Sequence, residues 1–116
     1  MNFQLNEEQQ QLTDSLKRVL DNEYGFESRQ KIVASAQGSS PAVWNTLAEL
    51  GVLGLPLSEG VGGFGSPAAE MVGVMEAMGE ALVVDPYLPT VCLAGRLIDR
   101  AGSEAQKDAV LPGVVE

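Results

Sequence analysis

Apolar residues recur every three or four positions along most of the chain, which is the spacing of one face of an α-helix. The first such set is Leu12, Leu16, Val19 and Leu20. Asn6 precedes it as a suitable N-cap residue, and Gln9 stands at the capping-box position. Gly25 offers a C-terminal stop. The pattern therefore predicts a first helix between Asn6 and Gly25.

Two further helices are predicted before residue 52. A polar one runs from about residue 26 to 37, closes at Gly38, and is expected to turn three side chains inward. Those side chains are Ile32, Val33 and Ala36. In the second, Ser40 is the cap, Pro41 occupies the first turn and Gly51 ends the helix. Its apolar face consists of Val43, Leu47 and Leu50.

A long apolar helix is predicted from Pro67 to about Val83, because Ser66 and Pro67 repeat the cap-plus-proline opening. One face carries Met71, Met75, Met78 and Leu82, and the other faces carry Val72, Val74, Ala77 and Ala81. A helix that is apolar all round is expected to be buried. A methionine stripe can also form a cofactor or partner surface, but core packing is the favoured interpretation.

The last third of the chain predicts two more helices. The segment "TVCLAGRLIDRAG" is helical up to Gly102, and the final segment opens with Ser103 as cap and Gln106 at the capping-box position. The chain stops with Val114 and Val115 unaccompanied by further structure, so we expect it to be a fragment of a longer protein. The predicted fold class is all-α, a bundle of about six helices in an orthogonal or up-down arrangement.

The hexapeptide "GVGGFG" at 60–65 raises an alternative, because its glycines match the G-x-G-x-x-G turn of dinucleotide-binding folds. Asp85 lies 20 residues beyond Gly65, where such a fold places its ribose-binding carboxylate. However, the strand that should precede the turn contains Pro56, and no other segment is a convincing strand. We therefore favour a glycine connection between two helices, with "LVVD" (82–85) as the end of the helix that follows.

Composition and charge narrow the function classes. With 45% hydrophobic and 20% charged residues, the 116-residue chain is typical of one globular domain rather than a disordered segment. The net charge of −9 argues against binding to nucleic acid or anionic membranes. No apolar run approaches membrane-spanning length, and the polar N-terminus is no signal peptide. The single Cys92 is expected to fill the core, and one cysteine cannot form an intrachain disulfide, so a cytoplasmic location is expected.

Metal and acid–base chemistry have little support. The chain has no histidine, which excludes imidazole catalysis and histidine metal sites. Glu70, Glu76 and Glu80 are therefore expected to form a solvated or interface face rather than a carboxylate metal site.

The order of these segments resembles the N-terminal helical domain of the acyl-CoA dehydrogenase family. Three blocks carry the resemblance: "LAELGVLGLPLSEGVGGFG" (47–65), "VMEAMGEAL" (74–82) and "AGSEAQKDAVLPGVVE" (101–116). Within the family, residues 21–32 and 83–95 look most like the small subunits of pimeloyl-CoA dehydrogenase-type enzymes.

The resemblance implies part of a flavoprotein that oxidises an acyl-CoA to the 2,3-enoyl-CoA and passes electrons to an electron-transfer flavoprotein. In that family a glutamate takes the Cα proton while FAD accepts hydride. The glutamate and most flavin contacts belong to a C-terminal helical domain and a β-domain beyond this chain. No catalytic, cofactor-binding or metal-binding residue is therefore expected in it, and we expect the isolated fragment to be inactive, without tightly bound FAD, and prone to weak self-association.

The resemblance also implies that this domain forms one wall of the acyl-tail cavity, at positions corresponding to Pro89, Thr90 and Leu93. Simple helix packing is an equally open interpretation of these residues. Tyr87 could point its hydroxyl at substrate, but plugging the end of the bundle is favoured. A second class of function stays open, a non-catalytic helical domain that supports a partner subunit.

Overall fold

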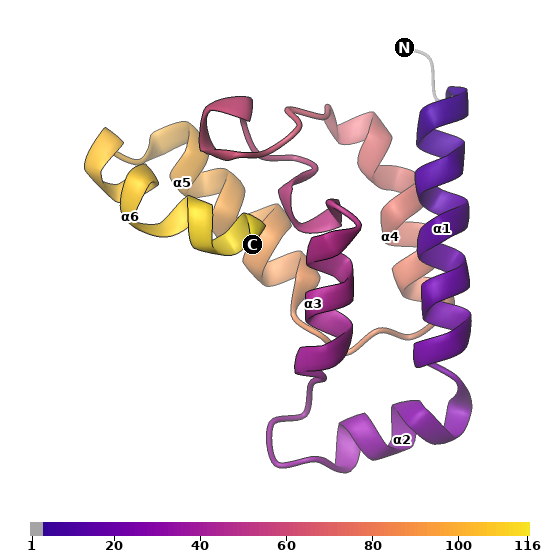
Figure 1. Cartoon of the computed structure of the whole chain (residues 1–116). Helices are drawn as coiled ribbons and strands as arrows, with labels where there is room; N and C mark the ends of the chain where they lie inside the picture. Colours follow the sequence, from indigo (N-terminus) through magenta and orange to yellow (C-terminus); the bar gives the residue numbers. More distant parts are fainter. Residues whose placement is uncertain (1–3) are drawn as a thin grey trace. The chain divides into compact units, whose positions relative to one another are not determined.

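The computed structural model describes residues 4–116, and within them the chain forms six α-helices and several shorter helical turns but no strand (Figure 1). The all-α class predicted from the sequence is therefore confirmed. Two compact units are present: residues 4–46 with 68–85, and residues 47–67 with 86–116.

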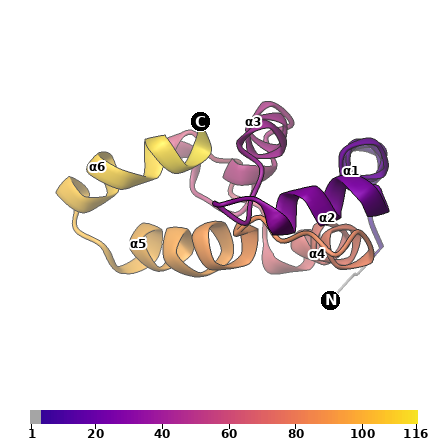
Figure 2. The ribbon, with the colours of Figure 1, turned by 90° about the horizontal axis from the view of Figure 1, so that it is seen from below.

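The first unit contains most of the N-terminal helices. Its elements are α1 (Glu7–Glu23), α2 (Phe26–Ala34), the start of α3 (Pro41–Glu49), the 3₁₀ turn η3 (Ala68–Glu70) and α4 (Met71–Glu80). Helices α1 and α4 pack side by side (Figures 1 and 2). Their close approach depends on Gly73, since a Cβ at that position would lie 2.9 Å from Thr13 Oγ1.

The predicted starts of α1 and of the last helix are confirmed, because each begins with a capping box between residues three positions apart. Asn6 Oδ1 accepts from the Gln9 amide at 2.8 Å, and the Gln9 side chain accepts from the Asn6 amide at 2.9 Å, which completes a capping box. Ser103 and Gln106 form the same motif at the start of α6 (Glu104–Val115).

The second helix is shorter and more exposed than predicted. It ends at Ala34, and none of its residues is buried; Val33 and Ala36 are exposed and Ile32 is only partly covered. The serine after it explains the early end, because Ser35 Oγ donates to the Ile32 carbonyl and accepts from the Gly38 amide. The prediction that Gly38 closes this helix is wrong, because the C-cap residue is Ser35; Gly38 instead adopts a positive φ of 66° in the connection that follows.

The apolar helix also differs from its prediction at both ends. It begins at Met71 rather than Pro67, after η3, and ends at Glu80 rather than Val83. Leu82 adopts a φ of 53°, while its amide donates to the Gly79 carbonyl and the Val83 amide donates to the Met78 carbonyl. These are the two bonds of a Schellman C-cap, so "LVVD" lies beyond the helix and not at its end.

Burial on α4 is one-sided, so the expectation of a helix buried all round is wrong. The buried residues are Met71, Gly73, Val74, Ala77 and Met78. Val72 and Leu82 are exposed, and Met75 is partly covered. The two most buried methionines pack in the core, which supports the core interpretation of the stripe.

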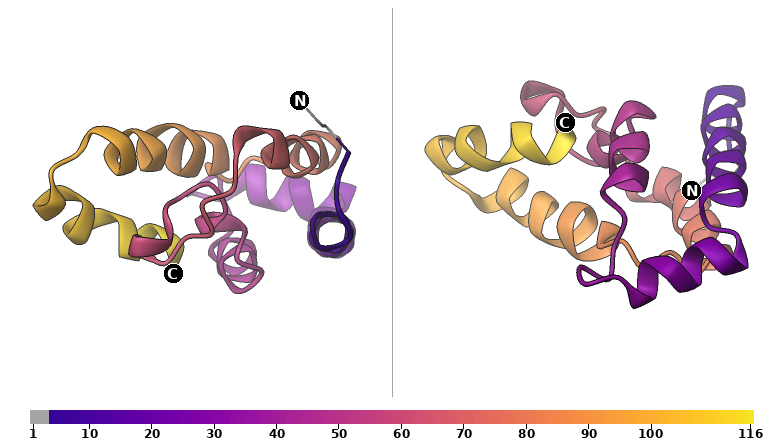
Figure 3. Two further views of the ribbon diagram at one scale, coloured as in Figure 1. Left: turned by 90° about the horizontal axis from the view of Figure 1, so that it is seen from above. Right: turned by 60° about the horizontal axis from the view of Figure 1, so that its bottom comes forward.

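The second unit is built around the segment that follows α3 and the helices after Pro86. Its elements are the 3₁₀ turns η1 (Val52–Gly54) and η2 (Glu59–Val61), the π-helix η4 (Leu88–Gly95), α5 (Arg96–Ala101) and α6. Helix α6 contacts η1, η2, η4 and α5 (Figures 2 and 3). Its core comprises Leu47, Val52, Leu53, Leu55, Leu57, Tyr87, Val91 and Leu111.

Candidate functional site

The glycine-rich segment folds back on its own chain. The amides of Gly63, Phe64, Gly65 and Ser66 donate to the carbonyls of Ser58, Gly54, Leu57 and Leu55, respectively, at 2.7 to 3.0 Å. A phosphate-binding turn needs such amides free to face the ligand. Because these four are already bonded to carbonyls and no strand precedes them, the dinucleotide alternative is excluded for this segment.

The glycines meet two different demands in this turn. Gly62 and Gly65 have φ values of 90° and 64°, as expected for a glycine connection. At Gly63 the demand is steric instead, since a Cβ would lie 2.2 Å from the Leu57 carbonyl oxygen and 2.7 Å from that of Gly54. The favoured interpretation of the hexapeptide as a connection is therefore confirmed.

Asp85 forms hydrogen bonds with groups of the protein itself, and not with a ribose as the dinucleotide alternative required. Its carboxylate is buried, accepts a hydrogen bond from the Tyr24 hydroxyl, and accepts one from the Ser40 amide at 2.8 Å. The Tyr24 oxygen in turn accepts the amides of Val84 and Asp85 at 3.3 Å. This cluster ties together the end of α1, the start of α3 and the segment after α4 within the first unit.

The cluster also changes the acidity of Tyr24. Burial, followed by the hydrogen bond to Asp85, raises the pKa of the Tyr24 phenol to about 12. The sequence contained one signal for this site, a lone aspartate between an apolar run and a proline, but its partners lie 45 and 61 residues away.

The three residues predicted for the acyl-tail wall lie together on η4. Pro89 and Leu93 are exposed and Thr90 is partly exposed. Leu93 and Leu97 have 60% and 66% of their surface exposed, so one face of the η4–α5 run is open and apolar. The structure thus brings the predicted residues onto one accessible surface, and the wall function itself stays a prediction.

The wider π-helical turn was not predicted by the sequence. Gly95 permits it, because a Cβ there would lie 3.0 Å from the Thr90 carbonyl oxygen and 3.3 Å from a methyl group of Leu57. π-Helical turns are rare and are found frequently at functional sites. The three predicted wall residues all fall within this one.

The other side chains of this region have structural roles. Tyr87 is almost fully buried and donates its hydroxyl to the Val52 carbonyl at 2.9 Å, which confirms the plug interpretation. Burial raises the pKa of both the Tyr87 phenol and the Cys92 thiol. Cys92 is only partly covered, so it is less of a core residue than predicted.

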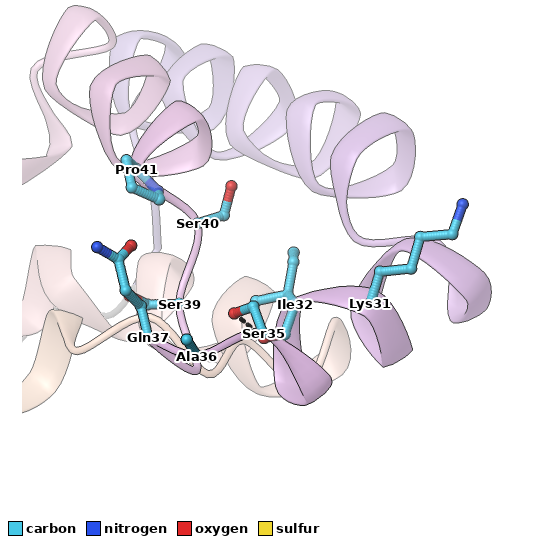
Figure 4. A pocket seen from close by; sticks show the side chains of 8 residues that line it. All are labelled: Lys31, Ile32, Ser35, Ala36, Gln37, Ser39, Ser40 and Pro41. Carbon is cyan, nitrogen blue, oxygen red and sulfur yellow. Dashed lines mark hydrogen bonds between the residues drawn. The ribbon is translucent and has the colours of Figure 1, made fainter.

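A shallow depression of about 550 Å³ lies in the first unit, between the end of α2 and the start of α3 (Figure 4). It is lined by Lys31, Ile32, Ser35, Ala36, Gln37, Ser39, Ser40 and Pro41. The Lys31 amine points away from the other lining residues (Figure 4), and the hydroxyls of Ser35 and Ser40 hydrogen-bond to backbone groups. No charged group is therefore aimed into the depression.

Residues 4–116 contain no group of three or more His, Cys, Asp or Glu side chains that could hold a metal ion. Glu76 and Glu80 are exposed and Glu70 partly so, as predicted for a solvated face. The glycine turn does not fit the phosphates of a flavin, because its amides already donate to backbone carbonyls. No helix among these residues is long and apolar enough to cross a membrane.

The described residues thus form an all-helical domain with a glycine connection after α3 and an exposed apolar face on the η4–α5 run. Residues 6–116 match the family model "Acyl-CoA dehydrogenase, N-terminal domain". The chain belongs to this family.

Two curated relatives come from different bacteria. Acyl-CoA dehydrogenase FadE27 of Mycobacterium tuberculosis is 30% identical over 89% of this chain and 28% of its own length. (2S)-Methylsuccinyl-CoA dehydrogenase of Cereibacter sphaeroides is 32% identical over 93% of this chain and 20% of its own length. The chain therefore spans less than a third of either relative.

Two solved structures are similar as well. A variant of the Tcur3481-Tcur3483 steroid ACAD superposes with a TM-score of 0.87 at 28% identity, over 94% of this chain and 30% of that one. The ChsE4-ChsE5 complex from Mycobacterium tuberculosis gives a TM-score of 0.88 at 28% identity, over 99% of this chain and 32% of that one.

Proposed function

We propose that this chain is the N-terminal domain of a FAD-dependent acyl-CoA dehydrogenase that oxidises an acyl-CoA to the 2,3-enoyl-CoA. The observation that carries the proposal is the family match over residues 6–116, together with relatives that are themselves acyl-CoA dehydrogenases. The remaining machinery, the flavin site and the base, belongs to regions that this chain does not contain.

The contribution of this chain is to wall the acyl tail and to support the subunit. Pro89, Thr90 and Leu93 present an accessible apolar surface on η4, which suits a hydrocarbon tail. None of the chain's carboxylates has a role in taking the Cα proton. FAD supplies the oxidising chemistry in the assembled enzyme, and an electron-transfer flavoprotein is its electron acceptor in this proposal.

The assembly is expected to be hetero-oligomeric, with this chain in the smaller subunit of a pimeloyl-CoA dehydrogenase-type enzyme located in the cytoplasm. The support for more than one subunit is that a structural relative is a complex of two named proteins. Exposed apolar side chains at Phe26 and Phe64 provide surface that partners could cover.

The test is to express the protein from its own gene, with its neighbouring reading frames, and to assay acyl-CoA oxidation with an artificial electron acceptor. Copurified FAD and formation of the enoyl-CoA support the proposal. In the same preparation Leu93→Trp should raise the KM for long-tailed acyl-CoAs about tenfold by filling the tail space. Val110→Trp, on an exposed site of α6, is the matched control and should leave the KM unchanged.

A second candidate is a non-catalytic helical domain that supports a catalytic partner subunit. The exposed apolar residues on both units favour it. The two candidates separate on one substitution: in a supporting domain, Leu93→Trp weakens copurification with the partner, while the KM of whatever partner remains bound does not depend on tail length.

A further inference from the structure

The helix run that carries the predicted acyl-tail wall is held from its opposite face by a two-residue segment, Leu57 and Ser58. The carboxylate of Asp99 on α5 accepts the Ser58 hydroxyl at 2.7 Å through Oδ1 and the Ser58 amide at 3.0 Å through Oδ2. Both oxygens of the Asp99 carboxylate therefore accept hydrogen bonds from Ser58.

One turn earlier on the same helix face, the side chain of Leu57 packs against Gly95. Leu57 is fully buried, and its methyl groups lie 3.3 and 3.8 Å from where a Gly95 Cβ would be. A larger residue at position 95 would therefore push Leu57 and the helix apart. Leu57 and Ser58 therefore contact the helix at two points one turn apart. These contacts restrict both its shift along its axis and its rotation about it.

The same two residues also anchor the glycine turn. The Leu57 carbonyl accepts the Gly65 amide at 2.7 Å, and the Ser58 carbonyl accepts the Gly63 amide at 3.0 Å. At Gly63 the turn approaches the Leu57 carbonyl so closely that no Cβ fits. The two residues that contact η4–α5 therefore belong to a backbone segment that is itself hydrogen-bonded to the glycine turn.

The wall and the support lie on opposite faces of this run. Leu93 lies two positions from Gly95 and Leu97 two positions from Asp99, about half a turn around the helix, and both leucines are exposed. A rotation of the helix toward Ser58 would move the outer leucines by a comparable amount in the other direction. Small errors in positioning are known to affect catalysis strongly.

We propose that the Ser58–Asp99 pair and the Leu57–Gly95 contact hold the η4–α5 helix in position. This position sets the length of acyl tail that the η4 wall accepts. The effect on tail length rests on the proposed function of the wall. The positioning of the helix by Ser58 and Leu57 does not depend on that function. Asp99 and Ser58 are positioning residues; neither needs to touch the substrate.

The variants are Asp99→Ala, Ser58→Ala, Ser58→Thr, and Asp99→Ala combined with Ser58→Ala, in the protein expressed from its own gene. Asp108→Ala, which removes an exposed carboxylate on α6, is the matched control. Saturated acyl-CoAs of increasing tail length are assayed for kcat and KM separately.

Asp99→Ala should lower kcat/KM for the longest tails by about 3- to 10-fold through KM, while the shortest tails change by less than about twofold. Ser58→Thr keeps both hydrogen bonds and should behave as the unchanged protein. The double variant should equal Asp99→Ala alone, because the serine hydroxyl has lost its partner. An unaltered tail-length profile in folded Asp99→Ala overturns the proposed control of tail depth.

Hydrogen exchange on the same proteins tests positioning without any substrate. Asp99→Ala should speed exchange of the amides of residues 63–66 about tenfold and leave those of α4 unchanged. Unchanged exchange at residues 63–66 overturns the positioning role. If the unchanged protein oxidises no acyl-CoA at all, the proposed function fails and the tail-depth inference fails with it, while exchange still decides whether the pair positions the helix.

Discussion

Gly63 provides the sharpest test of how the glycine turn is built. A Cβ at this position would lie 2.2 Å from the Leu57 carbonyl oxygen, 2.5 Å from the Leu57 carbonyl carbon and 2.7 Å from the Gly54 carbonyl oxygen. All three are backbone atoms, so no side-chain rotation relieves the overlap. Gly63→Ala must therefore move the chain by about 1 Å.

The magnitude follows from the hydrogen bonds that such a shift disturbs. Four amides, from Gly63 to Ser66, donate to carbonyls between Leu55 and Ser58 or to Gly54. Each is worth about 1 kcal/mol net, and losing good geometry in two to four of them costs about 2–4 kcal/mol. We expect Gly63→Ala to lower the free energy of unfolding by that amount.

Gly60→Ala is the control, because a Cβ at Gly60 meets nothing within 4 Å and its φ lies outside the positive region. This change should alter the free energy of unfolding by less than about 0.5 kcal/mol. Urea unfolding followed by far-ultraviolet circular dichroism measures both, with the slope of the transition checked for constancy. Equal stabilities of the two variants would refute the steric argument for the turn.

Three further predictions use matched substitutions or pH. Gly73→Ala should lower the free energy of unfolding by about 1–3 kcal/mol, because the new Cβ meets Thr13. Gly79→Ala on the same helix should raise it by about 0.5–1 kcal/mol. Equal effects in thermal melts would contradict the packing of α1 on α4. Leu82→Gly should stabilise the chain by about 1 kcal/mol, because glycine adopts the φ of 53° without strain, and a loss of stability would argue against the Schellman cap. The raised pKa of Tyr24 favours the protonated phenol in the folded state, so its contribution to stability is complete below pH 10 and is lost as pH rises through about 12. Unfolding curves between these pH values should show a fall in the free energy of unfolding that is smaller in Tyr24→Phe, and equal falls would contradict the coupling.

The helix starts could be predicted because their causes are local. Asn6 with Gln9, and Ser103 with Gln106, are three residues apart and form the bonds that their spacing suggests. The glycine turn was also predictable in kind, since positive φ at Gly62 and Gly65 is what a connection between helices demands.

The missed features depend on contacts that sequence spacing does not carry. The end of α4 at Glu80 requires Leu82 to adopt a conformation that leucine rarely takes, so the apolar run to Val83 gave the wrong boundary. The hydrogen bonds of Asp85 join residues 45 and 61 positions apart. For the candidate site, the three residues predicted for the wall lie on one helical segment, but the π-helical turn that carries them depends on a close approach at Gly95.

We have proposed that this chain is part of a flavin-dependent acyl-CoA dehydrogenase. The most direct test of this proposal is to mix the protein, purified from its own gene together with its neighbouring reading frames, anaerobically with acyl-CoAs and to follow the visible flavin absorbance. We expect copurified FAD whose absorbance bleaches on mixing, with a product two hydrogen atoms lighter by mass spectrometry. A preparation that contains no flavin and leaves every acyl-CoA unchanged would contradict it.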